Sequence, residues 1–332
     1  MQKKTSDAEV SEFLPSELFF TDEQEKKVEN ILSSTKKENV PDFWNQEICE
    51  TIYVPVDDGE LRVLHIKPKN PQSKRLLVFI PGWGGLVEGY TDFYEVIHNQ
   101  LEFYFIETRE KSSSKLDRRK AKMNMTQKAK DIQDIIKYLG IDKQDFTLFG
   151  TCWGGAIILH GLIKGLIKAP TIVANDPMHT LWFPKWLLKY IAPFIPVPIV
   201  KLLKPIFKKT QLRGMEEEVQ RKRAEAFVDK ADAWKWKKTA EAVKDFELIG
   251  RMSSIQEEVF ITNGTTDKVH NQYTYPVMAK ELPNGRFIYM KTDESKREYL
   301  MGYLALEFCK VISDDGIPPS LQEFEKNLVR EQ

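Results

Sequence analysis

One short stretch of the chain, residues 145–165, combines a strand, a sharp turn and a helix pattern around a single cysteine. Glycines stand two positions before and two positions after Cys152, at Gly150 and Gly154, in the sequence GTCWGG. A tight strand-turn-helix connection requires such glycines, because it leaves no room for neighbouring Cβ atoms and strains its central residue. The stretch therefore predicts Cys152 as an exposed nucleophile above a sheet. The alternative is a glycine-rich turn with a buried thiol.

A second glycine-rich loop follows a strand that is apolar throughout. Residues 76–80, LLVFI, contain no polar side chain, which is typical of a strand covered on both faces. The strand ends at Pro81 and continues as GWGG, whose glycines allow backbone N–H groups to face a ligand. We interpret this loop as a binding element, with a plain turn as the alternative.

We call the strand-turn-helix connection around Cys152 the elbow. Together with the elbow, four segments in this order and spacing resemble the α/β-hydrolase superfamily, over residues 50–312. They are LLVFIPGWGG at 76–85, FYFIETREKSSS at 103–114, DIQDIIKYLG at 131–140 and VFITNGTTD at 259–267. In the family the second segment usually contains D-x-R-G-x-G-x-S, and its glycines are absent here. A cysteine in the elbow is similar to the dienelactone-hydrolase and polyhydroxyalkanoate-synthase branches of the superfamily.

The resemblance implies a mostly parallel central sheet with helices on both faces and an inserted helical cap. It implies that Cys152 is the nucleophile and that the backbone amides of Trp83 and Trp153 bind the oxyanion. The family's triad acid falls on Asp267, and Asp176 stands where some members keep their acid instead. The resemblance implies neither a cofactor nor a metal.

The family's catalytic histidine has no counterpart at its usual place. Residues 291–297, KTDESKR, follow the strand at 286–290 and contain no histidine. A thiol with an ordinary pKa of about 8.5 is only a few per cent ionised at neutral pH without a neighbouring imidazole. The candidate substitutes are His270, on the loop after Asp267, and His179, after the strand beside the nucleophile strand. The third alternative is a site without a functional base.

Two function classes follow from these patterns. The first is an acyl hydrolase or acyltransferase of the esterase or thioesterase class, in which Cys152 attacks a hydrophobic acyl substrate. The second is a catalytically impaired homologue that binds a small molecule or a protein partner through the same pocket. Hydrolysis and acyl transfer both remain open for the first class, and the sequence does not fix the oligomeric state.

The composition changes along the chain in a way that predicts separate regions. A helix is expected at 21–32, where TDEQE provides a cap and first-turn acids, and an antiparallel hairpin at 50–67. The predicted regions are an N-terminal arm outside the core at 1–45, the α/β-hydrolase core at 46–177 and 251–332, and a helical cap at 178–250.

The first part of the predicted cap is apolar and aromatic with interspersed lysines, LWFPKWLLKYIAPFIPVPIVKLLKPIFKK. Prolines at 193, 196, 198 and 205 predict short helical pieces. Three roles fit the segment: packing of the cap on the core, an apolar wall for an acyl chain, and an interfacial membrane contact with snorkelling lysines. The aromatic residues that the spacing places on one helical face are Trp182, Trp186, Tyr190 and Phe194.

Charge and cysteine content exclude several classes of protein. The 49 basic and 49 acidic residues cancel, which argues against a general nucleic-acid binder. The three cysteines have no paired spacing, so neither a disulfide framework nor a zinc site is predicted. No apolar signal segment opens the chain, and we expect a cytoplasmic protein. The basic run at 111–122 is either a solvated face or a contact for an anion.

Overall fold

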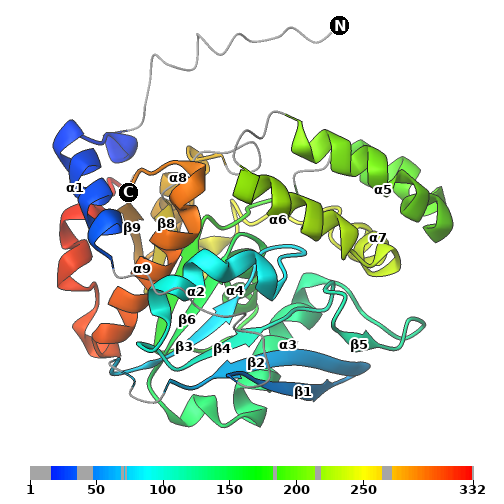
Figure 1. Cartoon of the computed structure of the whole chain (residues 1–332), viewed down its shortest axis with the longest axis horizontal. Helices are drawn as coiled ribbons and strands as arrows, with labels where there is room; N and C mark the ends of the chain where they lie inside the picture. The colour runs from blue at the N-terminus through cyan, green and yellow to red at the C-terminus, as the bar shows by residue number, and fades with distance from the viewer. Residues whose placement is uncertain are drawn as a thin grey trace, which may run out of the picture.

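A ten-stranded sheet runs through the centre of the protein (Figure 1). The computed structural model describes residues 16–35, 48–68, 71, 73–181, 185–213, 218–263 and 271–330. The strand order is β1-β2-β4-β3-β6-β7-β8-β9-β10, and β5 pairs with β2. The strands are β1 (Glu50–Val56), β2 (Gly59–Ile66), β3 (Leu76–Ile80), β4 (Phe103–Ile106), β5 (Lys115–Leu116), β6 (Phe146–Thr151), β7 (Thr171–Asn175), β8 (Val259–Asn263), β9 (Gly285–Tyr289) and β10 (Glu325–Lys326).

The strands from β4 to β9 in this order pair in parallel. Every residue of β3, β6, β7 and β8 is buried, as expected for parallel strands that are covered on both faces. Because the carboxyl ends of parallel strands meet at one edge of a sheet, the loops after these four strands are neighbours. This edge carries the glycine-rich loop and the elbow.

The antiparallel strands lie at the two ends of the sheet. The predicted hairpin is confirmed, with Val56 opposite Gly59 across the turn. At the other end β10 pairs antiparallel with β9, so the strand predicted at 286–290 has one further neighbour at the edge of the sheet.

Helices cover both faces of the sheet, as predicted. One buried cluster lies under α3 (Met125–Tyr138), α4 (Trp153–Ile163) and α8 (Thr274–Glu281). The other lies under α1 (Asp22–Ser34), α2 (Thr91–Ile97) and α9 (Arg297–Lys310). Short helical turns complete the connections: η1 (Ser16–Leu18), η2 (Val87–Tyr90), η3 (Ile141–Lys143), η6 (Met252–Ser254), η7 (Glu294–Lys296), η8 (Ser313–Asp315) and η9 (Pro319–Phe324).

Helix α1 confirms the predicted capping pattern and packs one face against the core. The Thr21 side chain accepts a hydrogen bond from the Gln24 backbone amide, and the Gln24 side-chain oxygen accepts one from the Thr21 amide. Val28 and Leu32 are buried in the cluster that α2 and α9 share. The described part of the N-terminal region is therefore packed onto the core.

Between β7 and β8 the chain forms a helical insert, which lies together at one side of the molecule (Figure 1). It contains η4 (Leu187–Ile191), η5 (Ala192–Phe194), α5 (Val197–Leu212), α6 (Glu218–Asp229) and α7 (Ala233–Ala242). Its two ends pair through the bridge between Thr180 and Glu247. The break predicted at Pro205 is wrong, because this proline lies inside α5, which is 16 residues long.

Candidate active site

The elbow has the strained geometry that its glycines predict. Cys152 has φ 53° and ψ −112°, in the region that side chains rarely adopt, and it directly precedes α4. A Cβ at Gly150 would lie 2.7 Å from Gly155 N, and one at Gly154 would lie 2.1 Å from Ile80 O. Only glycine fits at these two positions, so Cys152 sits half-buried at the carboxyl edge of the sheet.

The loop after β3 lies directly against the elbow. A Cβ at Gly82 would lie 3.3 Å from the Cys152 Cβ and 3.7 Å from its Sγ. The loop turns through a hydrogen bond from Gly85 N to Gly82 O, with Gly84 at φ 61°. Among the described residues, no acceptor binds the backbone N–H of Trp83 or of Trp153. The structure therefore brings together two available amides beside the Cys152 thiol.

Buried side chains hold both ends of the Gly82 peptide. The Gly82 amide donates to the Tyr90 hydroxyl at 3.0 Å, and the Lys111 ammonium donates to the Gly82 carbonyl. Burial and the neighbouring Cys152 raise the pKa of Tyr90 well above its usual range. The hydroxyl consequently stays protonated, and the loop cannot shift without breaking buried hydrogen bonds.

Lys111 belongs to a buried ionic network, contrary to the solvated or anion-binding role considered for the basic run. It donates to the Glu110 carboxylate at 3.1 Å, and Lys128 donates to the other carboxylate oxygen. Burial opposes ionisation of Glu110, but the two ammonium groups outweigh it and hold its pKa well below the usual range. From α7, Lys235 donates to the Lys111 carbonyl at 2.8 Å and fastens the insert to this network.

At the carboxyl end of β7, the buried Asp176 adopts φ 44°. Its carboxylate accepts hydrogen bonds from the side-chain amides of Asn263 and, at 3.1 Å, Asn175. Nε of Arg297 lies 3.3 Å from the same carboxylate. An acidic group therefore stands one strand away from Cys152, at the alternative acid position noted in the sequence, and its cationic neighbour is an arginine.

Arg297 comes from the segment where the family resemblance places a histidine. This segment forms η7, which the Asp293 side chain caps by accepting from Lys296 N, and α9 begins at Arg297. The missing histidine is visible in the sequence, whereas the pairing of Arg297 with Asp176 is not. The available signal was the place of Arg297 in the connection that follows the last parallel strand, β9.

Of the predicted acid and the two candidate bases, the structure describes one. Asp267 and His270 lie outside the described residues. His179 Nδ1 lies 2.7 Å from Glu247 Oε1, where the two ends of the insert pair, a place that we call the neck. The preceding Met178 amide donates to the Cys152 carbonyl at 3.2 Å. The neck thus holds His179 one residue from a direct backbone contact with the elbow.

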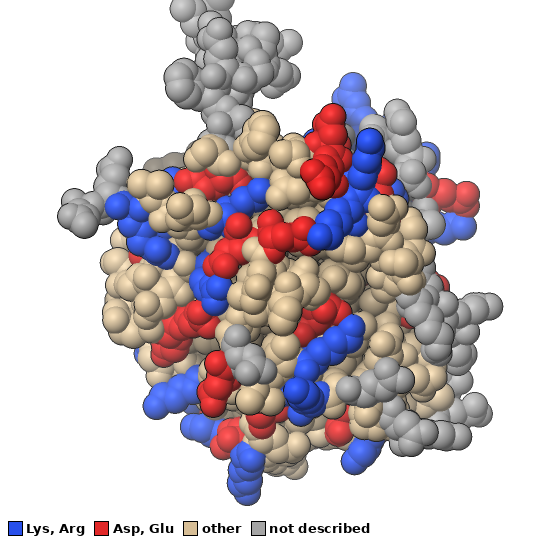
Figure 2. All heavy atoms as spheres, turned by 90° about the vertical axis from the view of Figure 1, so that its left-hand side faces the viewer, with Lys and Arg blue, Asp and Glu red and all other residues tan. Residues whose placement is uncertain are grey.

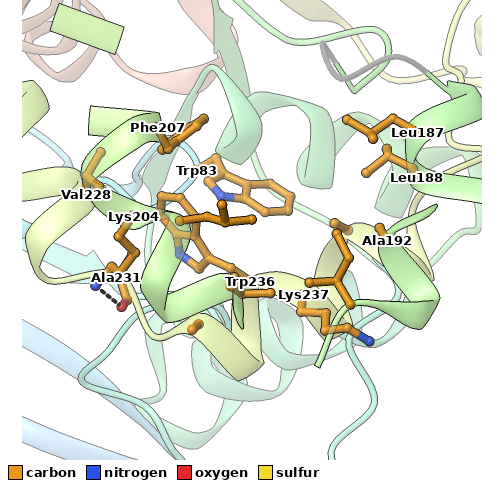
Figure 3. A pocket seen from close by; sticks show the side chains of 15 residues that line it. Trp83, Leu187, Leu188, Ala192, Lys204, Phe207, Val228, Ala231, Trp236 and Lys237 are labelled. Carbon is orange, nitrogen blue, oxygen red and sulfur yellow. Dashed lines mark hydrogen bonds between the residues drawn. The ribbon is translucent and has the colours of Figure 1, made fainter. Parts of the chain in front are cut away.

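An apolar cavity of about 230 Å³ lies within the insert, and Trp83, from the loop after β3, also lines it (Figure 3). The Trp83 ring packs 4.8 Å from the Trp153 ring, centre to centre, and 6.2 Å from that of Trp236. Lys204 lines the cavity with its chain, while its ammonium donates to the backbone carbonyls of Asp229 and Ala231. The other lining residues are Leu187, Leu188, Ala192, Ile195, Val200, Leu203, Phe207, Val228, Ala231, Ala233, Lys237 and Ala240.

The described ranges contain no group of three or more His, Cys, Asp or Glu side chains that could hold a metal ion. Within the same ranges, no helix has the length and hydropathy needed to cross a membrane.

Comparisons with known proteins support the fold. No family model and no curated protein matches the sequence. An esterase from Exiguobacterium antarcticum superposes with a TM-score of 0.63 at 17% identity, covering 79% of this chain and 99% of that one. A hydrolase from Pseudomonas aeruginosa gives 0.60 at 13% identity, with 77% and 98% covered. A thermophilic esterase from Thermogutta terrifontis gives 0.55 at 12% identity, with 77% and 95% covered. The chain has the α/β-hydrolase fold.

Proposed function

We propose that the protein is an acyl hydrolase or acyltransferase of the esterase or thioesterase class, with Cys152 as its nucleophile. The observation that carries this proposal is the strained φ of 53° at Cys152, beside the two available amides of Trp83 and Trp153. A strained backbone persists only where its surroundings enforce it, and here it aims a thiol at the carboxyl edge of the sheet.

In the proposed reaction the Cys152 sulfur attacks the acyl carbon, and the carbonyl π electrons move to oxygen. The amides of Trp83 and Trp153 bind this oxyanion, and each such donor contributes about 3 kcal/mol to the transition state. The tetrahedral intermediate collapses to a thioester while the leaving alcohol or thiol takes up a proton. Water or an acceptor hydroxyl or thiol then attacks the thioester and regenerates the thiol.

The thiol proton must go to a base. Cys152 is the N-cap residue of α4, and the N-terminus of a helix favours a negative charge, which supports a thiolate at this position. We propose His179 or His270 as the base, with Asp267 orienting whichever histidine acts. His179 has the second feature of such a base, a carboxylate at one ring nitrogen, since Glu247 lies at its Nδ1 and leaves Nε2 for the proton.

The proposed substrate is a hydrophobic acyl compound. The cavity beside Trp83 is lined by aliphatic and aromatic side chains, and the ammonium groups of Lys204 and Lys237 are bound to backbone carbonyls of the insert. Such a lining recognises an alkyl chain by burial of its surface and offers no charged group for a polar head. We propose that residues 178–250 act as a cap that holds this chain.

A second candidate function is binding without turnover. It is supported by the pair of Arg297 and Asp176, which stands where the family resemblance places the imidazole and contains no histidine. In this alternative the cavity of the insert binds a hydrophobic molecule, and Cys152 remains a protonated thiol.

The deciding experiment is the rate of Cys152 alkylation by iodoacetamide as a function of pH, in a Cys49→Ala/Cys309→Ala background. Burial raises the pKa of both removed thiols to about 11, so their replacement removes only a slow background. An inflection well below the ordinary thiol pKa, moved by His179→Ala or His270→Ala, supports the enzyme. A rate that rises only near the ordinary pKa supports the binding protein.

Turnover is measured in parallel on acetyl and decanoyl esters and thioesters. Cys152→Ala is expected to abolish turnover, with Cys309→Ala as the matched control. Turnover that survives Cys152→Ala would falsify the nucleophile assignment.

A further inference from the structure

The insert turns apolar side chains outward as well as inward. Three large rings that the sequence places on one face, Trp186, Tyr190 and Phe194, are 59%, 64% and 82% exposed, so they do not pack on the core. Trp182 lies outside the described residues. We call the outer face of the insert the following set: Trp186, Tyr190, Phe194, Ile199, Leu202 and Ile206, all of which are at least 46% exposed. Large apolar side chains that are exposed in such number within one short segment, residues 186–206, indicate an interaction site.

Helix α5 has exposed apolar side chains in addition to those that line the cavity. Val200 and Phe207 line the cavity, as expected for the inner stripe of an amphipathic helix. Ile199, Leu202 and Ile206 recur at intervals of three and four residues and form an outer stripe. A helix that only covers a core needs one apolar stripe, so the outer stripe requires another partner.

The charge of the segment indicates which partner. Residues 177–215 contain no acidic residue and seven basic ones: Lys185, Lys189, Lys201, Lys204, Lys208, Lys209 and Arg213. Lys189, Lys201 and Lys209 are exposed and form no ion pair with any described residue. On the face that carries α1, basic and acidic side chains are instead intermingled (Figure 2). The segment that contains the outer face is therefore cationic, in a chain whose net charge is zero.

We propose that the outer face binds the surface of an anionic lipid bilayer. Aromatic and aliphatic side chains enter the headgroup boundary, and the lysines extend toward lipid phosphates. A second copy of the chain is a poorer occupant, because two copies joined through this face would bring like charges together. The inference concerns binding alone and stands whether or not Cys152 performs acyl chemistry.

This orientation has a consequence for the cavity. The same helix carries the outer stripe and the inner stripe, so a surface-bound protein holds the cavity next to the lipid chains. A hydrophobic molecule could then pass between bilayer and cavity without crossing bulk water.

The test is flotation of the full chain with two kinds of vesicle, phosphatidylcholine alone and phosphatidylcholine mixed with phosphatidylglycerol. We expect binding to the anionic vesicles, at least about tenfold weaker binding to the neutral ones, and release at about 1 M salt, where charge interactions are screened.

Apolar and charge variants locate the contact. The apolar variant is Phe194→Ser/Leu202→Ser/Ile206→Ser, and its control is Phe19→Ser/Tyr138→Ser/Val329→Ser, which alters equally exposed side chains elsewhere. The charge variant is Lys189→Ser/Lys201→Ser/Lys209→Ser, and its control is Lys137→Ser/Lys143→Ser/Lys168→Ser, which removes the same net charge from other exposed positions. Both outer-face variants are expected to bind anionic vesicles about tenfold more weakly or worse, and both controls within about twofold of the parent.

Several outcomes would overturn the proposal. They are an absence of binding to anionic vesicles at low salt, an equal loss in a variant and its control, and a parent dimer in light scattering that the apolar variant abolishes. Thermal unfolding of each variant, expected to be unchanged because all the sites are exposed, separates lost binding from lost fold.

Discussion

The carboxyl edge of the sheet and the outer face of the insert treat their side chains in opposite ways. At the edge the charged groups Lys111, Glu110 and Asp176 are buried and have defined partners: Lys111 donates to Gly82 and Glu110, and the half-buried Arg297 lies against Asp176. On the outer face large apolar side chains are in water. At the edge, buried contacts fix the positions of the side chains. The outer face leaves apolar surface available for a partner. The fixed geometry of the candidate site and the surface proposed for binding therefore lie in different parts of this chain.

The energetic contrast between the two regions follows from burial. Removing one member of a buried ionic pair leaves an uncompensated charge, which typically costs about 3 to 5 kcal/mol. Changing an exposed side chain usually alters stability by less than about 0.5 kcal/mol. Substitutions at the edge should therefore act on folding and on the site together, and those on the outer face on binding alone.

The largest expected effect is that of Gly154→Ala. The added Cβ would lie 2.1 Å from Ile80 O, so β3 or the elbow must move. We expect loss of the folded state, or a drop in unfolding free energy of more than about 3 kcal/mol in urea titrations. Gly89→Ala is the matched control, because nothing lies within 4 Å of its Cβ. Equal stability of the two variants would show that the elbow is not tightly packed.

Lys111→Met tests the buried network. The substitution keeps the chain length but leaves Glu110 with one ammonium partner and the Gly82 carbonyl without its lysine donor. We expect destabilisation of about 3 to 5 kcal/mol. Lys115→Met, at an exposed ion pair with Glu60, should cost about 1 kcal/mol or less. If both lysines cost the same in chemical denaturation, burial does not distinguish the two regions.

His160 extends the contrast to pH. Burial lowers its pKa from 6.5 to about 4, with Arg251 and Lys164 contributing. Between these values the unfolded chain takes up a proton that the folded chain does not, so stability falls as pH decreases from 6.5 to about 4, by up to about 3 kcal/mol. His160→Gln should reduce this slope in urea titrations across that window and leave a constant offset above it. An unchanged slope would remove His160 from the acid response.

Filling the cavity should affect long substrates only. Ala240→Leu adds volume inside the insert and reduces the space for an alkyl chain. We expect kcat/KM for a decanoyl ester to fall about tenfold, since a few methylenes of fit are worth that much, while the acetyl ester reports an unchanged nucleophile. Equal losses for both esters would mean that the cavity does not hold the acyl chain.

The smallest expected effect belongs to the outer face. Leu202→Ala, at 76% exposure, should change the unfolding free energy by less than about 0.5 kcal/mol. The same substitution at the fully buried Leu148 in β6 should cost about 2 to 5 kcal/mol. A large loss at Leu202 would indicate that the outer face is already covered in the free protein.

Much of the fold could be predicted because its signals are local. Glycine spacing around Cys152 predicts a turn that no other residue can occupy, and the observed φ of 53° agrees. The uninterrupted apolar strand at 76–80 predicts a position covered on both faces, which is confirmed. The capping pattern at Thr21 likewise acts within four residues. The roles proposed for Asp267, His270 and His179 remain predictions.

Tertiary structure alone decided which charged and apolar side chains are buried. Lys111 stands in a basic run, and only the approach of Gly82 and Glu110 turns it into a buried donor. Arg297 lies against Asp176 because the end of β7 and the start of α9, more than a hundred residues apart in the chain, lie at the same edge of the sheet. The amphipathic spacing of α5 is visible in sequence, but which stripe faces the cavity and which faces water depends on neighbours that local pattern does not encode. The sequence therefore determined the elbow and the layers, since these follow from short-range sterics and periodicity. Long-range packing decided the partners of the site and the surface left open for binding.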